Sequence, residues 1–272
     1  MSYPLLGRVR FPKLKDAEQH SFNLSDIKVS IELNSVLTKW GEQENFPDNI
    51  NIFDREQYQH DGDSIGYHSY FRTRWDIKGT VLRQSEKSHI YVNLAIVKGS
   101  KDLNFFIPEQ LRDTIKSENQ KRFDDDSYYL NVTALREFQQ VSINDTDYLF
   151  YVNDIEYCAT ADSQDYVWIT PITENHYLQF TFGVTNNTEV RDHLETIKDY
   201  CTSIMQTVHI DFPDWVEREK AAAASVVKDT RQIAAMEPLV WKREADTGSY
   251  LDFRREAAEK AKQTEEQDNT NC

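Results

Sequence analysis

The sequence has no segment that could cross a membrane. No run approaches ~18 consecutive apolar residues, the length that a transmembrane helix requires. The N-terminal MSYPLLGRVRFPKLKDAEQ contains no apolar core long enough for a signal peptide. The sequence therefore predicts a soluble, cytoplasmic protein with no membrane contact.

Cysteine, glycine and proline are scarce. The three cysteines, Cys158, Cys201 and Cys272, are odd in number and far apart, so we expect no disulfide framework and a reducing compartment. Eight glycines and seven prolines leave little room for linkers, whereas an aromatic content of 12% is typical of a packed core. Cys201 lies on an apolar helical stripe, which predicts a buried, unreactive thiol.

Basic residues are also few. The sequence contains 31 Lys and Arg and 46 Asp and Glu, which gives a net charge of −15. The first 215 residues carry 21 basic and 34 acidic side chains, a net of −13, and the remaining residues carry 10 and 12, a net of −2. Such an acidic body repels nucleic acid and favours basic partners. The alternative is that the charge serves only solubility.

The motifs of common catalytic and cofactor sites are missing. The sequence contains no Gly-x-Ser-x-Gly, Cys-x-x-Cys, His-Glu-x-x-His or EF-hand loop. The nearest pair of glycines, Gly62 and Gly66, lacks the Lys-Ser/Thr of a phosphate-binding loop. We therefore expect no cofactor, no metal and no catalytic residue that can be named from the sequence.

One loop, HDGDSIGYH from His60 to His68, offers a weak alternative. Its side chains His60, Asp61, Asp63 and His68 could converge on a divalent metal, which would suit a hydrolytic, metal-assisted enzyme with a site around His60–His68. An exposed turn with solvated histidines explains the same pattern, and we prefer that interpretation.

Alternating apolar residues predict several strands, the clearest at 27–33, 89–98 and 176–184. Asn153-Asp154 is predicted as a hairpin turn between two aromatic runs. Val190, Leu194 and Ile197 begin an apolar stripe that predicts an amphipathic helix over 189–208. These elements predict an α+β fold in which a mainly antiparallel sheet of about six to eight strands carries this helix on one face.

The chain after residue 213 has a different character. Asp214 and Glu217 have the spacing of a capping box, and Ala-rich helical segments follow. We predict an α+β body over 1–213 and a helical C-terminal extension over 214–272. The extension has too little apolar volume for its own core, so it must pack on the body or on a second chain, as in a homo-oligomer.

The strand-rich middle of the sequence combines tyrosines with acidic residues. Tyrosine supplies contact area at low entropic cost, and neighbouring carboxylates select a basic partner. The alternative is that the tyrosines pack a sheet. The predicted binding residues are Asp124, Asp125, Asp126, Tyr128, Tyr148, Tyr151, Asp154, Tyr157 and Tyr166.

The strand HYLQFTF, followed by a helix ending in SIMQTVHI, resembles the end of the PsbP-like α/β proteins, including their bacterial DcrB-type branch. The resemblance covers roughly residues 128 to 212. It implies a mostly non-enzymatic binding role and supplies no catalytic residues. Together with the charge, it predicts a non-catalytic cytosolic protein that binds a basic protein. An immunity or inhibitor protein against a cationic toxin fits this description, as does an adaptor of a secretion system.

Overall fold

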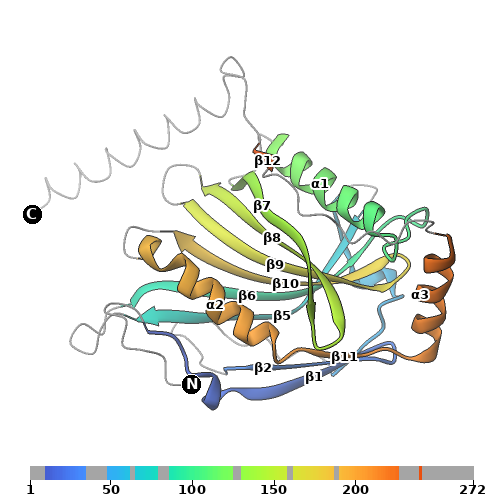
Figure 1. Cartoon of the computed structure of the whole chain (residues 1–272), viewed down its shortest axis with the longest axis horizontal. Coiled ribbons are helices and arrows are strands. Elements are labelled where there is room, and N and C mark those ends of the chain that lie inside the picture. The colour runs from blue at the N-terminus through green and yellow to red at the C-terminus, as the bar shows by residue number, and fades with distance from the viewer. Residues whose placement is uncertain are drawn as a thin grey trace, which may run out of the picture.

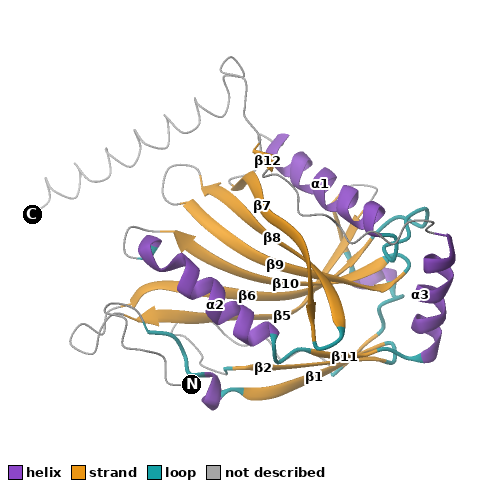
Figure 2. Ribbon diagram, viewed as in Figure 1, coloured by secondary structure: helices purple, strands orange, loops and turns teal. Residues whose placement is uncertain are grey.

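The computed structural model describes residues 10–34, 48–61, 65–78, 86–124, 130–157, 162–186, 190–226 and 239–240. This part of the chain contains two β-sheets and three α-helices (Figures 1 and 2). Both sheets are mainly antiparallel. The predicted α+β class with a mainly antiparallel sheet is therefore confirmed.

The main sheet has eight strands in the order β12-β7-β8-β9-β10-β6-β5-β4, and all neighbours are antiparallel. Its centre is a meander, β7 to β10, joined to the β5–β6 hairpin where β10 pairs with β6. The strands span β4 (Gln59–Asp61), β5 (Ile65–Lys78), β6 (Glu86–Lys98), β7 (Leu130–Ile143), β8 (Thr146–Tyr157), β9 (Asp162–Thr173), β10 (His176–Asn186) and β12 (Leu239–Val240).

The predicted hairpin turn at Asn153-Asp154 is wrong. Both residues lie within β8, and the tight turn of this hairpin is Asn144-Asp145, between β7 and β8. Asn144 and Asp145 have φ values of 48° and 61°, a left-handed conformation that asparagine and aspartate tolerate. Asn144-Asp145 and Asn153-Asp154 are both suited to a tight turn by their residue types. The pairing of β8 with β9 keeps Asn153-Asp154 within a strand, so the turn forms at Asn144-Asp145.

The small sheet has the order β11-β2-β1-β3, with β1 (Glu18–Leu24), β2 (Ile27–Leu33), β3 (Asn49–Ile50) and β11 (His209–Asp211). Every second side chain of β2 is buried, as its alternating sequence predicts. These side chains join one hydrophobic core with the inner face of the main sheet and with α2 (Leu194–Met205). The small sheet and α2 therefore cover the same face of the main sheet (Figure 1).

Helix α1 (Pro108–Asp124) covers the opposite face of the main sheet. Its buried Leu111 and Ile115 form a second core with Leu135, Leu149 and Val167. Because successive side chains of a strand point to opposite faces, β8 and β9 contribute to both cores at once. This explains why the strands read as nearly continuous apolar and aromatic runs.

Of the two helices that follow β10, α2 is shorter than predicted, and α3 (Asp214–Val226) packs on the body, one of the two predicted arrangements. Helix α2 spans Leu194–Met205, after a short 3₁₀ turn at Arg191–His193, and is shorter than the predicted 189–208. Helix α3 buries Val216 in the first core, so it packs on the body. Leu239–Val240 is a strand paired with β7, so the segment after 213 is not entirely helical.

Candidate functional site

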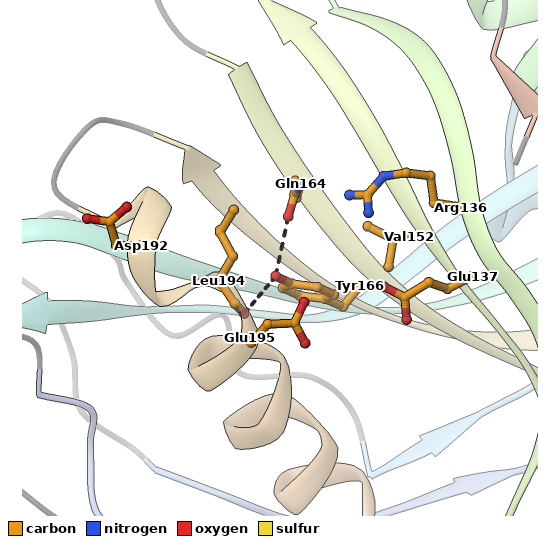
Figure 3. A pocket seen from close by; sticks show the side chains of 8 residues that line it. All are labelled: Arg136, Glu137, Val152, Gln164, Tyr166, Asp192, Leu194 and Glu195. Carbon is orange, nitrogen blue, oxygen red and sulfur yellow. Dashed lines mark hydrogen bonds between the residues drawn. The ribbon is translucent and has the colours of Figure 1, made fainter. Parts of the chain in front are cut away.

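A cavity of about 260 Å³ lies between strands β7 to β9 and the start of α2 (Figure 3). It is lined by Arg136, Glu137, Val152, Gln164, Tyr166, Asp192, Leu194 and Glu195. The meander supplies its inner side chains, and the 3₁₀ turn and first helical residues supply the rim. The cavity thus opens where two segments far apart in sequence meet.

Tyr166 anchors the helix to the sheet at this point. Its hydroxyl donates to the backbone carbonyl of Leu194 at 3.0 Å, and its oxygen lies 3.4 Å from Gln164 Oε1. The ring is buried, and this burial raises the pKa of the hydroxyl. Tyr166 therefore remains a neutral hydrogen-bond donor that fixes the position of the α2 N terminus.

Arg136 is already neutralised by a carboxylate. Its Nε donates to Asp154 Oδ2 at 2.5 Å and its Nη2 to Asp154 Oδ1 at 2.7 Å, and Gln164 Nε2 lies 3.1 Å from the same Oδ1. The hydrogen bond to Asp154 raises the pKa of Arg136. A bidentate ion pair of this kind holds the guanidinium in place. It also leaves little of the positive charge of Arg136 available to a ligand.

Glu137 has an unusual backbone conformation, with φ at 53°, and lies in a bulge where the β7–β8 register shifts. Its carboxylate is paired with Lys198 of α2, whose Nζ also lies 5.7 Å from the centre of the Phe150 ring. A left-handed non-glycine residue costs energy and persists where neighbouring contacts hold it. The bulge turns Glu137 towards α2 and adds a carboxylate to the cavity.

The cavity is therefore acidic. Glu137, Asp192 and Glu195 contribute three carboxylates, of which Asp192 and Glu195 are exposed. Lys198 pairs with Glu137 and lies 3.9 Å from Glu195, so one cation offsets part of this charge. The N terminus of a helix stabilises negative charge, so Asp192 and Glu195 are tolerated side by side at the start of α2. This arrangement can attract a cationic group. Cys201 on the same helix is fully buried and its thiol pKa is raised by burial, as expected for an unreactive thiol.

The structure does not assemble the predicted tyrosine surface. Tyr148, Tyr151 and Tyr166 are 1%, 3% and 2% exposed, so their rings cannot provide a contact surface. That prediction is wrong for these three residues because both faces of the sheet are covered. In a sheet with both faces covered, tyrosine rings pack in the cores.

The predicted acidic residues lie apart. Asp124 is exposed at the end of α1, and Asp154 pairs with Arg136 beside the cavity. Tyr157 ends β8, and its side chain lies outside the described residues. Asp125, Asp126 and Tyr128 also lie outside them. Of the predicted residues whose side chains the structure describes, Tyr166 and Asp154 belong to the cavity or its supporting contacts.

The alternative metal loop falls on the β4–β5 hairpin, where His60 pairs with Gly66. Residues 62–64 and the side chains of His60 and Asp61 lie outside the described part. His68 is half-buried beside the Tyr58 ring, and this burial lowers its pKa. Within the described ranges, no three His, Cys, Asp or Glu side chains come together as a metal site.

Sequence reasoning missed most of the cavity, including Arg136, Glu137 and Gln164. No local motif marks them, because they come together only through strand pairing and a bulge. Asp192 and Glu195 carried a usable signal, since two acids at the start of an amphipathic helix mark its N terminus.

Comparisons with known proteins give no relative for this chain. No family model, no curated protein and no solved structure matches it. The resemblance to PsbP-like proteins thus stays a prediction. Among the helices that the structure describes, none combines the length and apolar character needed to cross a membrane.

Proposed function

We propose that this protein is a non-catalytic protein-binding protein, and that the cavity at the start of α2 accepts a lysine or arginine side chain of a basic partner. One observation carries the proposal: Arg136 is paired with Asp154 and Lys198 with Glu137, so the two exposed carboxylates Asp192 and Glu195 leave the cavity with a net negative charge. The net charge of −15 supports it, because the surrounding field draws a cationic partner towards the chain.

Within this proposal the partner is a basic protein in the same compartment as the chain, the cytoplasm. A cationic toxin neutralised by an immunity or inhibitor protein has the required charge, and so does a basic component of a secretion system. The structure makes self-association through the C-terminal helices less favoured than the sequence alone suggests. Val216 and Ala223 of α3 are already buried within the chain and are not available to a second copy.

The binding of oligolysine and oligoarginine peptides tests the proposal, measured by fluorescence anisotropy at low and moderate salt. The variant Asp192→Asn/Glu195→Gln removes the two exposed carboxylates of the cavity. We expect it to weaken binding about tenfold, the effect of losing charge-assisted contacts. Melting curves should show that the variant stays folded, since both positions are exposed.

The matched control is Glu32→Gln/Asp211→Asn, which removes two exposed carboxylates of the small sheet and thus the same charge. We expect this control to change affinity about twofold or less, because only the general field is reduced. Equal losses in the two variants would mean that the peptides bind to overall charge, and the cavity would then have no specific role.

A further inference from the structure

Within the described part of the chain, three buried oxygen atoms without a hydrogen-bond partner belong to the face of the main sheet that α1 covers and to α1 itself. They are Asn119 Oδ1 of α1, Asn153 Oδ1 of β8 and Ser163 Oγ of β9. Their residues are 4%, 4% and 5% exposed. Buried polar atoms in folded proteins are nearly always paired, so such a group indicates a ligand or an ordered water.

Asp165, which is half-buried, lies beside two of these three residues. Strand pairing places it directly opposite Asn153, and it lies two residues from Ser163 on the same face of β9. Asn119 and Asp165 both lie near enough to the Tyr151 hydroxyl to influence its pKa, and Tyr151 lies two residues from Asn153 on the same face. We refer to Asn119, Asn153, Ser163 and Asp165 as the Asp165 cluster.

Gly183 of β10 leaves the space that the Asp165 carboxylate occupies. Gly183 lies opposite Asp165, and a Cβ added to it would be only 2.7 Å from Asp165 Oδ1. The carboxylate therefore lies close to the backbone of the neighbouring strand. Burial raises the pKa of Asp165 to about 6, and Arg122 of α1 acts in the opposite direction.

All the groups of the cluster offer oxygen atoms: one carboxylate, two amide oxygens and a hydroxyl. Oxygen donors of this kind are the ligands of hard metal ions, and they also accept hydrogen bonds from an ammonium group. We propose that the Asp165 cluster is a binding site for a small cation held through oxygen atoms. The site is separate from the cavity at α2, because the two lie on opposite faces of the sheet.

The charged neighbour to consider is Arg122, which is exposed on α1 and near enough to influence Asp165. A bound cation and Arg122 compete for the same carboxylate. Replacing Arg122 with Gln should therefore strengthen cation binding. If Arg122 alone serves as the partner of Asp165, the same replacement should destabilise the protein and give no cation response.

Thermal unfolding at pH 7.5 provides the test, with CaCl₂, MgCl₂, KCl and methylammonium chloride added separately at constant ionic strength. We expect at least one of them to raise the Tm of the wild-type protein by about 3 °C or more. A metal response with no methylammonium response assigns the site to a metal ion, and the reverse assigns it to an amine. Asp165→Asn should remove the response, and Asp211→Asn, an exposed matched control, should retain it.

The ¹³C chemical shift of the Asp165 carboxyl gives a second, independent readout. A saturating cation should lower the pKa of Asp165 from its raised value. The proposal is wrong if none of the four salts stabilises the wild-type protein more than Asp165→Asn, and in that case the buried oxygens bind only water. Peptide binding at the α2 cavity is not expected to change in Asp165→Asn, so this test and the earlier one fail independently.

Discussion

Gly183 occupies the middle of a central strand, where a glycine weakens the structure because it adds no packing side chain. Its position is explained by the Asp165 carboxylate, which occupies the space of a Cβ. We expect Gly183→Ala to destabilise the protein by about 1 kcal/mol, since a flexible side chain must move. Urea unfolding measures this cost.

A double-mutant cycle separates the contact from the general effect of alanine. In an Asp165→Ala background, Gly183→Ala should be neutral or stabilising, because the clash is gone and alanine restricts the unfolded chain. The same cost in both backgrounds would show that Asp165 is not the obstacle.

His176 is a second residue whose surroundings define a measurable effect. It is 1% exposed, its Nδ1 lies 2.8 Å from Thr173 Oγ1, and the Phe53 and Tyr58 rings pack beside it. Burial, with Lys98 on the neighbouring strand, lowers its pKa to about 4. The histidine is therefore neutral in the folded protein at pH values where the unfolded chain is protonated.

The sign of the pH effect follows from this difference. Between pH 6.5 and about 4 the unfolded state binds more protons, so the unfolding free energy falls on acidification, by up to about 3 kcal/mol from this group. Urea unfolding at pH 7, 5 and 4 should show that acidification lowers the stability of the wild-type protein relative to that of His176→Gln. His209→Gln, on β11, should follow the wild-type profile. Parallel profiles for wild type and His176→Gln would contradict the assignment.

At the scale of elements, α3 shows how a helix with little apolar volume is held. Val216 is fully buried in the first core, and Glu219 accepts a hydrogen bond from the Glu174 backbone N–H at 3.2 Å. We expect Val216→Ala to lower the unfolding free energy by about 2 kcal/mol through lost burial and a cavity. Val226→Ala, 71% exposed at the end of the same helix, is the control and should change it by about 0.5 kcal/mol or less. Equal effects would mean that α3 does not dock through Val216.

The sequence predicts elements better than it predicts their partners. Alternation located the strands at 27–33, 89–98 and 176–184, because burial on a sheet has period two. The ends of α2 and the turn between β7 and β8 were missed, since short-range chemistry permits Asn-Asp turns at two places and tertiary pairing selects one. The cavity was missed for a related reason: the bulge at Glu137 and the contact of Tyr166 with Leu194 join residues without a shared local pattern.

For the whole molecule, Asp165 and His176 make opposite contributions to the pH dependence of stability. The raised pKa of Asp165 means that its contribution is fully present below the unfolded pKa of about 3.9 and is lost as pH rises through about 6. On acidification, the Asp165 contribution to the unfolding free energy therefore rises, whereas the His176 contribution falls. The wild-type profile between pH 4 and 6 should be flatter than that of a variant lacking either group.

Asp165→Asn tests this compensation. We expect the variant to be about 1–2 kcal/mol more stable than wild type at pH 7, a value reduced because the side chain is partly exposed. Its stability should also fall more steeply on acidification, since only the His176 effect remains. Guanidinium unfolding across this pH range measures both quantities. A variant with unchanged stability at pH 7 and an unchanged slope would refute the raised pKa.

The place of β11 in the small sheet has a consequence for how the chain acquires its fold. Strand β2 pairs with β1 across a tight turn, but its other edge is completed by His209–Asp211, far along the chain. A contact of such long range closes slowly, because the chain must first lose the entropy of a large loop. On the ribosome, the apolar β1–β2 hairpin therefore keeps one edge open until residues 209–211 have been synthesised. During that interval the open edge of β2 can pair with other chains or bind a chaperone.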